Sequence, residues 1–330
     1  MARRRLLPRD GSLAMRLAKL VVSLVLVAAV IWKVGPHAVV PAVFRWQWLL
    51  VAISVFLVSN LLGAWQWSLL LRSAGISLER GKVVQTYFVG LFFNNFLIGN
   101  VGGDIMRAFD VRRHGTSSHQ GHAAVGVATI VMDRFLGFLT MMCFAGLALW
   151  AWHGDARAMQ IIVGLLGAFL VAGVLLTSRR IGTRWDRAVT ALLPRRMAQT
   201  VLNLRAGFVA MRQQPGALIG AACVSAFVQG MRIVVHYLCA SAIGLGIPFV
   251  YFAEFIPPIS VAAAFPISVG GLGMREWAAV GLFRAVGVAG AGVVTMELLA
   301  HAVTLVSSLP GALAFVVRGA KAPVAEMEKT

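Results

Sequence analysis

The chain has 330 residues, of which 59% are hydrophobic, and its mean hydropathy is +0.82. This composition argues against a soluble protein, because apolar stretches of about 18 to 25 residues, long enough to cross ~30 Å of hydrocarbon as helix, recur along the sequence. The net charge of +18 does not indicate a nucleic-acid partner, since the basic residues stand mainly between the apolar runs. We therefore predict an all-α polytopic membrane protein.

In chain order, six apolar runs are long enough to be full transmembrane helices. They cover about residues 17–34, 48–71, 123–150, 158–177, 216–242 and 292–317. The basic segments before the first run and between the fourth and fifth runs mark the cytoplasmic face, because short cytoplasmic loops carry an excess of Lys and Arg. This charge bias predicts a multi-pass protein of a bacterial inner membrane with both termini in the cytoplasm.

The same runs suggest how the chain is organised. A basic cytoplasmic N-terminus precedes a single transmembrane domain, which a cytoplasmic loop divides into two halves, and a short cytoplasmic tail follows. The corresponding ranges are 1–16 for the N-terminus, 17–320 for the domain (halves of about 17–177 and 216–318, loop 178–215) and 319–330 for the tail. The first run shows no clear cleavage site, so we expect it to be retained as a helix.

Two further apolar regions, 83–101 and 247–290, do not fit as single spans. A full crossing at 83–101 would move the arginines that follow it, and the basic loop 178–215, to the outer face. A hairpin that enters from and returns to the cytoplasm avoids this conflict. Region 247–290 must contain an even number of passes, as a hairpin from the opposite face or as two short spans.

The two unusual regions contain nearly the same phrase. VGGDIMR at 101–107 and VGGLGMR at 269–275 share five of seven residues. Two oppositely oriented re-entrant hairpins, each between full spans, are typical of inverted-topology repeats, and irregular backbone at membrane depth needs protein or water around it. The alternative is a chance match of a common apolar tripeptide.

The basic loop itself shows a helical pattern. Apolar residues recur at intervals of three and four on both sides of Pro194, which predicts two amphipathic helices on the inner membrane surface. The apolar positions are Trp185, Val189, Leu192, Met197, Val201, Leu204, Phe208 and Met211. The helices are either a contact for anionic lipid or a solvated positive loop with helical character.

Polar residues form stripes at helical spacing in three of the predicted spans. The stripes are Gly126, Thr129, Asp133, Gly137 and Thr140; Gln229, Arg232 and His236; and Glu297, His301, Thr304 and Ser308. Ionisable groups at the bilayer centre cost roughly 2.5 to 3.5 kcal/mol each on insertion scales, so they need partners or water. They either line a polar cavity or form structural ion pairs between helices. Asp133 and Arg134 lie about 100° apart on a helix and should face different partners.

The repeated phrases also predict two short helices whose N-termini point into the cavity. A short helix that begins after each pair of glycines would aim its N-terminal N–H groups into the cavity, and Asp104 and Arg107 start one helix while Arg275 and Glu276 start the other. Two positive helix ends and two arginines favour an anion such as phosphate. The alternative is that the arginines snorkel to the interface or pair with Asp104 and Glu276.

Several catalytic motifs are absent from the sequence. It contains no G-x-x-x-x-G-K-[ST], H-E-x-x-H or G-x-S-x-G pattern, and its three cysteines suggest neither a disulfide framework nor a zinc site. We therefore expect no enzyme activity, no cofactor and no metal.

Three motifs together resemble a known family. NNFLIGNVGGDIMRAFDVRRHG (94–115), VMDR (131–134) and FPISVGGLGMREW (265–277) are similar to the flippase-like transmembrane region of lysylphosphatidylglycerol synthases, which includes stand-alone integral membrane proteins. The similarity covers about residues 15–320. It implies a helical bundle with re-entrant hairpins that moves a lipid with a polar headgroup between leaflets. The resemblance implies that the matching positions are important for function. They are Asn95, Gly102, Gly103, Asp104, Arg107, Asp133, Arg134, Pro266, Gly270, Gly271, Gly273, Arg275 and Glu276.

This sequence departs from the family pattern in two respects. Ile98, Gly99 and Asn100 stand where related proteins often carry a Pro-Gly turn, and the chain has no soluble aminoacyl-transferase domain, so lysylphosphatidylglycerol synthesis is not expected. We predict a lipid translocase whose substrate has an anionic or glycosylated headgroup. The predicted binding residues are Asn95, Asp104, Arg107, Asp133, Arg134, Arg232, His236, Arg275, Glu276, Glu297 and His301.

Other functions and partners remain open from the sequence. The alternatives are a secondary transporter for a small soluble anion and a membrane partner of lipid- or glycan-modifying enzymes that acts through the basic loop. A homo-oligomer is also compatible with the sequence.

Overall fold

The computed structural model describes most of the chain. The described residues are 43–96, 102–117, 122–151, 156–177, 190–191, 194–264 and 273–327. The described part is almost entirely helical, with one pair of very short strands. The predicted span at 17–34 and the predicted amphipathic helix around Trp185 lie outside the described residues.

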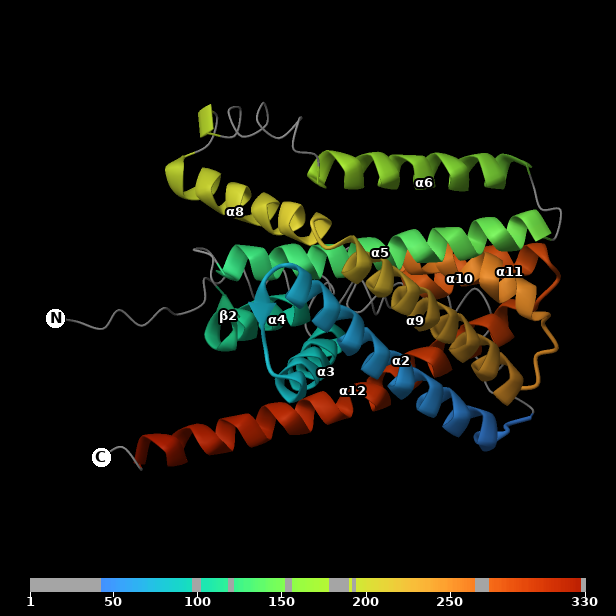
Figure 1. The fold of residues 1–330 in the computed structure, drawn as a ribbon. Coiled ribbons are helices and arrows are strands. Elements are labelled where there is room, and N and C mark those ends of the chain that lie inside the picture. The colour runs from blue at the N-terminus through green and yellow to red at the C-terminus, as the bar shows by residue number, and fades with distance from the viewer. Residues whose placement is uncertain are drawn as a thin grey trace.

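Four helices within these ranges are long and apolar enough to cross a membrane. They are α2 (Trp46–Ser73), α5 (His122–Ala151), α9 (Pro215–Ala242) and α12 (Gly290–Met327). In Figure 1, α5 runs almost horizontally, α2 and α9 slope downward to the right and α12 slopes the opposite way. In α12 the apolar part is Gly290–Val317. The structure thus confirms four of the six predicted full spans as long apolar helices.

Helix α6 (Ala156–Thr177) covers the predicted span at 158–177. It is 22 residues long and lies alongside α5 (Figure 1). Its side chains Val163, Leu170 and Val174 are exposed. An apolar face that the protein does not cover is what a helix beside lipid requires.

The region predicted as the first hairpin forms two short helices, α3 (Arg80–Phe96) and α4 (Gly102–His114), which pack on each other. Strand β1 (Ile76–Ser77) precedes them and strand β2 (Thr116–Ser117) follows them, and the two strands pair antiparallel. Because these strands pair, the segment that contains α3 and α4 starts and finishes at the same end of the bundle.

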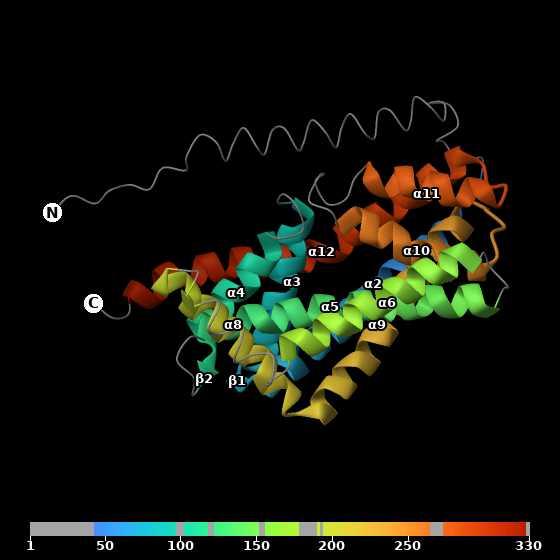
Figure 2. The ribbon, with the colours of Figure 1, turned by 90° about the horizontal axis from the view of Figure 1, so that it is seen from above.

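The second unusual region also forms two short helices in contact, α10 (Phe249–Ala264) and α11 (Met274–Ala285). The stretch 265–272, which includes Pro266, Gly270 and Gly271, lies outside the described residues. The pair α3 and α4 lies at one end of the bundle and the pair α10 and α11 at the other (Figures 1 and 2).

The two halves of the chain interlock. Helices α2 and α9 pack along each other, and the backbone N–H of Arg45, just before α2, donates to the carbonyl of Ala242 at the end of α9. They are therefore antiparallel. Helix α3 packs against α12 of the other half, and α10 packs against α5. Each pair of short helices thus contacts the long helix that follows the other pair.

The apolar core has two parts. One, around Phe252, Phe283 and Met296, joins α10, α11 and α12 to α9 and the start of α2. The other, around Trp67 and Met211, joins α3, α4, α5 and α8 to the end of α2 and the start of α9. Because α2 and α9 belong to both parts, they hold the two ends of the bundle together.

Helix α8 (Arg195–Arg212) is the second of the two predicted amphipathic helices. It packs on α5, and Ala198, Phe208 and Met211 are buried there, whereas Met197 is 58% exposed. Much of the predicted apolar stripe is thus covered by protein, which leaves a smaller apolar face for a membrane surface than the sequence suggested.

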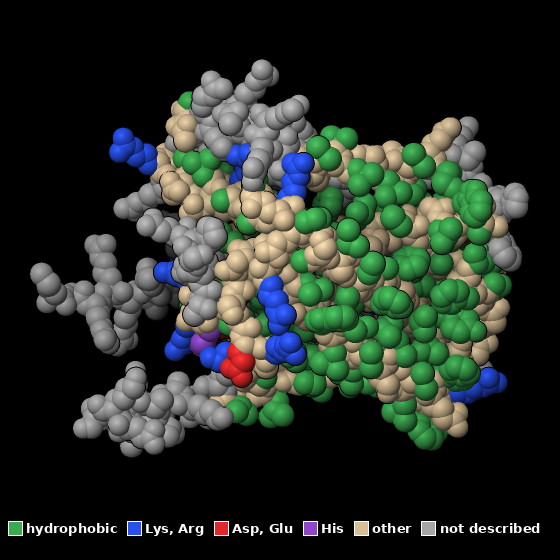
Figure 3. All heavy atoms as spheres, viewed as in Figure 1, with side chains coloured by type: hydrophobic (Ala, Val, Ile, Leu, Met, Phe, Trp, Pro, Cys, Tyr) green, Lys and Arg blue, Asp and Glu red, His purple; other side chains and the backbone are tan. Residues whose placement is uncertain are grey.

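Basic side chains gather at one end of the bundle. In Figure 3 the Lys and Arg atoms lie mainly in the half that contains α4 and α8, and apolar atoms cover most of the other half. The exposed cations Arg72, Lys82 and Arg113 all adjoin β1, α3 or α4 at this end.

Candidate functional site

A polar cavity of about 230 Å³ lies inside the bundle, and both halves of the chain line it. Its polar and charged lining residues are Gln66, Tyr87, Asn94, Asn95, Arg107, Asp133, Arg134, Gln229, Arg232, His236, Ser260, Arg275 and Thr304. Apolar residues such as Phe56, Phe138 and Ile256 form the rest of the wall. Among the charged groups that line the cavity, arginines outnumber carboxylates.

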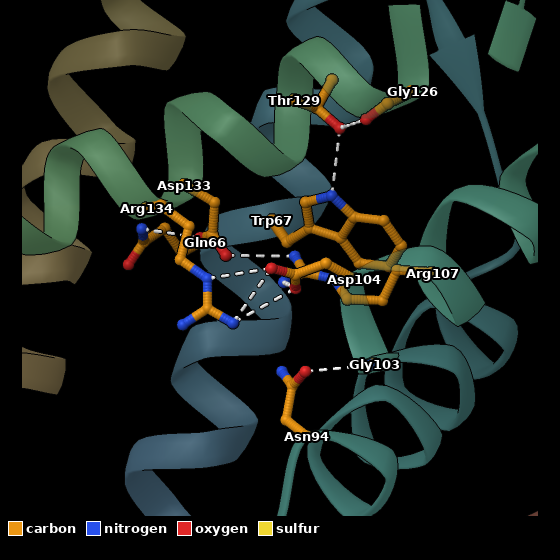
Figure 4. A network of polar contacts seen from close by, with 10 residues as sticks. All are labelled: Gln66, Trp67, Asn94, Gly103, Asp104, Arg107, Gly126, Thr129, Asp133 and Arg134. Carbon is orange, nitrogen blue, oxygen red and sulfur yellow. Dashed lines mark hydrogen bonds and ion pairs between the residues drawn. The ribbon is translucent and has the colours of Figure 1, made fainter. Parts of the chain in front are cut away.

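Arg107 of α4 is the centre of the first charged cluster (Figure 4). Its side chain is 5% exposed, and its guanidinium donates to Asp133 of α5 at 3.0 Å. The other oxygen of Asp133 accepts a hydrogen bond from the amide of Gln66 of α2 at 2.9 Å. Arg107 also lies 3.6 Å from Asp104, one turn before it. The alternative that Arg107 pairs with Asp104 is therefore confirmed, whereas the alternative that it snorkels to the interface is wrong.

Arg134 points to a different partner from its neighbour Asp133, as predicted. Its Nε and one Nη atom donate to the two oxygens of Asp104, both at 3.2 Å. Two parallel hydrogen bonds to one carboxylate are the geometry that a planar guanidinium favours. Asp104 therefore joins α4 to α5, and Arg107 and Asp133 join the same two helices a second time.

Aromatic rings cover the guanidinium of Arg107. Its central carbon lies 4.2 Å from the ring centroid of Trp67 and 4.9 Å from that of Tyr87, so cation–π attraction adds to the ion pair. The indole N–H of Trp67 donates to the hydroxyl of Thr129 at 3.1 Å, and that hydroxyl donates to the carbonyl of Gly126. The predicted stripe on α5 thus holds the aromatic ring that covers Arg107.

The glycines of the first phrase serve close packing. Helix α4 begins at Gly102, so both glycines lie in its first turn and not before it, which corrects the predicted start. A side chain at Gly103 would overlap the carbonyl oxygen of Gly90 on α3. The N–H of Gly103 donates to the side-chain oxygen of Asn94 at 2.8 Å. This N–H group is therefore already bound by the protein and is not offered to a ligand.

The second phrase shows a similar arrangement. Gly273 has a φ of 85°, a conformation that favours glycine, and its N–H donates to the carboxylate of Glu276 at 2.6 Å. Arg275 lies 4.0 Å from Glu297 of α12, and His236 of α9 lies 3.6 Å from the same carboxylate. The alternative that Arg275 pairs with Glu276 is wrong, because Glu276 caps its own helix.

The remaining stripes face inward. Gln229, Arg232 and His236 all line the cavity from α9. On α12, Glu297 and Ser308 are buried, Thr304 lines the cavity and His301 is half-buried. Neither oxygen of Glu297 has a hydrogen-bond partner among the described residues. The polar groups of three spans thus converge on one region, as their spacing predicted.

Most of the predicted binding residues come together. The predicted residues that line the cavity are Asn95, Arg107, Asp133, Arg134, Arg232, His236 and Arg275. Asp104, Glu297 and Glu276 stand behind them as partners or as a cap.

Some participants were not predicted from the sequence. Gln66, Trp67, Tyr87 and Asn94 complete the cluster around Arg107. Gln66 is a polar residue inside an apolar run, and Asn94 adjoins the predicted Asn95, so polarity alone could have indicated both. The aromatic residues carry no such signal, because an aromatic residue is ordinary in a span.

Comparisons with known proteins agree with the predicted resemblance. The model of the family described as the lysylphosphatidylglycerol synthase TM region matches residues 16–311. A UPF0104 membrane protein of Pyrococcus horikoshii is 26% identical over 307 residues, 85% of this chain and 90% of that protein. One from Methanothermobacter thermautotrophicus is 23% identical over 272 residues, 77% of this chain and 80% of that protein. No solved structure matches the chain.

Proposed function

The chain belongs to the lysylphosphatidylglycerol synthase TM region family, and we propose that it moves a lipid with an anionic or glycosylated headgroup between the leaflets of a bacterial inner membrane. The observation that carries this proposal is the cavity of about 230 Å³ inside an apolar bundle, with arginines as its main charged groups. A cavity of this size has room for a headgroup, and the tails would stay in the bilayer. The protein would bind and release the lipid without changing it chemically.

We also propose that the two halves are an inverted repeat with re-entrant hairpins. The antiparallel packing of α2 on α9 supports this, because the corresponding helices of oppositely oriented halves run in opposite directions. The matched contacts of α3 with α12 and of α10 with α5 support it further. In this arrangement, Arg107 faces a carboxylate of the following long helix, and so does Arg275.

The basic end of the bundle supports the orientation. Exposed Arg and Lys side chains gather near α4 and α8, and such an excess marks the cytoplasmic face. Helix α12 ends on this side (Figure 1), which agrees with a cytoplasmic C-terminus. The hairpin of α3 and α4 would then enter from the cytoplasm, and the hairpin of α10 and α11 from the other face.

The proposed path for the headgroup runs between the hairpins. The guanidinium of Arg275 lies 4.0 Å from the carboxylate of Glu297. That of Arg107 lies 3.0 Å from Asp133 and is covered by the rings of Trp67 and Tyr87. Arg275 is therefore more available to a headgroup than Arg107 is. A direct contact of Arg107 with lipid stays a prediction of the sequence.

The test is lipid movement in proteoliposomes with a substitution that fills the cavity. The full chain is reconstituted with phosphatidylglycerol that carries a fluorescent tail, and a membrane-impermeant reductant is added outside. Thr304→Trp places a large ring in the cavity, and Ala302→Trp places the same ring on the exposed side of the same helix. We expect the wild type and Ala302→Trp to expose inner-leaflet lipid to the reductant, and Thr304→Trp to leave it protected.

Other outcomes would favour other functions. If a folded Thr304→Trp variant moves lipid as the wild type does, the cavity is not the path. If no lipid moves but labelled phosphate enters the vesicles, the protein transports a soluble anion. If neither moves, a role as a partner of a lipid- or glycan-modifying enzyme becomes the better proposal. Because α8 packs on α5, that role is tested by substituting its exposed Arg195 rather than by deleting the loop.

A further inference from the structure

The first charged cluster of the cavity is electrically balanced. Its two guanidinium groups, Arg107 and Arg134, face two carboxylates, Asp133 and Asp104, and every one of the four groups takes part in an ion pair. An added anion would have to displace a carboxylate that already has good geometry. This cluster therefore leaves no net charge for a ligand.

The second charged cluster contains one arginine without an ion pair. Arg275 and His236 approach the same carboxylate, Glu297, at 4.0 and 3.6 Å. Arg232 approaches none, since no ion pair joins it to a carboxylate among the described side chains, and its buried Nε has no hydrogen-bond partner there. Among the described residues, the side chain of Arg232 has one polar contact, a long hydrogen bond of 3.5 Å from one Nη atom to the amide oxygen of Gln229.

Neighbouring segments of the sequence do not supply the missing charge. The stretches 97–101 and 265–272, which follow α3 and α10, contain no Asp or Glu. Three of the four arginines that line the cavity pair with Asp104, Asp133 or Glu297, and the carboxylate of Glu276 caps α11. Among the described residues, Arg232 is therefore the lining arginine whose charge no carboxylate pairs.

Arg232 cannot relieve this charge at the membrane surface. It stands ten residues before the end of α9, which is about 15 Å along the helix at ~1.5 Å per residue, and it is still farther from the start. It lines the cavity and is half-buried. A charged group at this depth is unfavourable unless an opposite charge or water accompanies it, so an anion in the cavity would be stabilised.

We propose that Arg232 is the primary ligand of one phosphodiester group, bound in the cavity with His236 one turn further along α9. This inference rests on the proposed function and specifies its substrate class. A guanidinium presents parallel N–H groups that match two phosphate oxygens. A phosphodiester has one negative charge, which matches one unpaired guanidinium, whereas a phosphomonoester has about −1.5 to −2 near neutral pH. The amide groups of Gln229 and Asn95 face the same cavity and offer further hydrogen bonds.

The experiment measures binding to the purified full chain in detergent. The probes are dihexanoyl phosphatidylglycerol, uncharged dihexanoylglycerol and glycerophosphoglycerol, a water-soluble phosphodiester. Arg232→Gln removes the unpaired charge. Arg232→Lys keeps the charge but lacks the parallel N–H groups of a guanidinium, and Arg113→Gln removes an exposed charge outside the cavity. We expect Arg232→Gln to weaken phosphatidylglycerol binding at least about tenfold, Arg232→Lys to weaken it less, and Arg113→Gln to have no effect.

A second measurement separates binding from folding. Removing an unpaired charge from the bundle should leave the unfolding midpoint of Arg232→Gln without ligand equal to or above that of the wild type. Loss of a structural ion pair would lower the midpoint instead, which would overturn the assignment. Unchanged phosphatidylglycerol binding in Arg232→Gln would overturn it as well.

The probes also distinguish this inference from the proposed function. If glycerophosphoglycerol binds as tightly as the lipid, and Arg232→Gln weakens both, the anion site stands but its source is a soluble anion. Lipid translocation would then lose its support. If proteoliposomes move phosphatidylglycerol and an uncharged lipid at equal rates, and Arg232→Gln changes neither rate, translocation stands and the assignment of Arg232 is wrong.

Discussion

The substitution Asp133→Asn should destabilise the bundle strongly, because it leaves Arg107 buried without a close carboxylate. The Arg107 side chain is 5% exposed and lies 3.0 Å from Asp133. The remaining carboxylate, Asp104, is 3.6 Å away and already receives the fork of Arg134. Removal of one partner from a buried ion pair costs about 3 to 5 kcal/mol in the free energy of unfolding. The hydrogen bond from Gln66 can persist to the Asn side-chain oxygen.

A second substitution separates the charge effect from other losses. Arg107→Met in the Asp133→Asn background removes the unpaired cation, so the double variant should cost less than the sum of the two single variants. What remains is mainly the lost contact of the guanidinium with Trp67 and Tyr87, worth about 0.5 to 2 kcal/mol.

The assay is thermal unfolding of the full chain in detergent, followed by tryptophan fluorescence, with gel filtration to verify the folded state at the start. At about 2 to 4 °C per kcal/mol, Asp133→Asn should lower the midpoint by roughly 10 °C. A midpoint within about 1 °C of the wild type, or single effects that simply add in the double variant, would refute the claim that this ion pair stabilises the contact between α4 and α5.

Gly103→Ala should cost about 1 to 3 kcal/mol in the free energy of unfolding, because the new methyl group overlaps the carbonyl oxygen of Gly90. Phe208→Ala should cost about 3 to 5 kcal/mol, since this ring of α8 is buried, whereas Met197→Ala on the exposed face should stay within about 0.5 kcal/mol. Glu276→Gln should cost about 0.5 to 2 kcal/mol, because it weakens the cap on the N–H of Gly273, the residue just before α11. The midpoint of thermal unfolding measures all four variants.

Each of these predictions has its own control or contrary result. Gly164→Ala on α6 adds a methyl group that meets nothing within 4 Å, so it should not destabilise, and an equal loss in both glycine variants would rule out the overlap with Gly90. Equal losses in Phe208→Ala and Met197→Ala would mean that α5 does not hold α8 in solution. A Glu276→Gln midpoint equal to that of the wild type would show that the cap contributes no stability.

The sequence by itself determined the membrane class, four of the long helices and the positions of the two short helix pairs. Length and hydropathy are local properties, so a run of apolar residues predicts a helix without knowledge of its neighbours. Helical spacing likewise predicted that Gln229, Arg232 and His236 share a face, because one turn of α-helix has 3.6 residues whatever surrounds it. The motifs indicated the family, which the match over residues 16–311 confirmed.

Only the tertiary structure decided which charged groups meet. Arg107 pairs with a carboxylate 26 positions away, and that carboxylate receives Gln66 from 67 positions away. Arg275 approaches Glu297 and not its neighbour Glu276. Pairings of this kind depend on the rotation and depth of separate helices, and the spacing within each helix leaves both undefined. The conclusion that Arg232 has no ion pair depends on the same pairings. An unpaired charge can be recognised only when the partners of all the other charged groups are known.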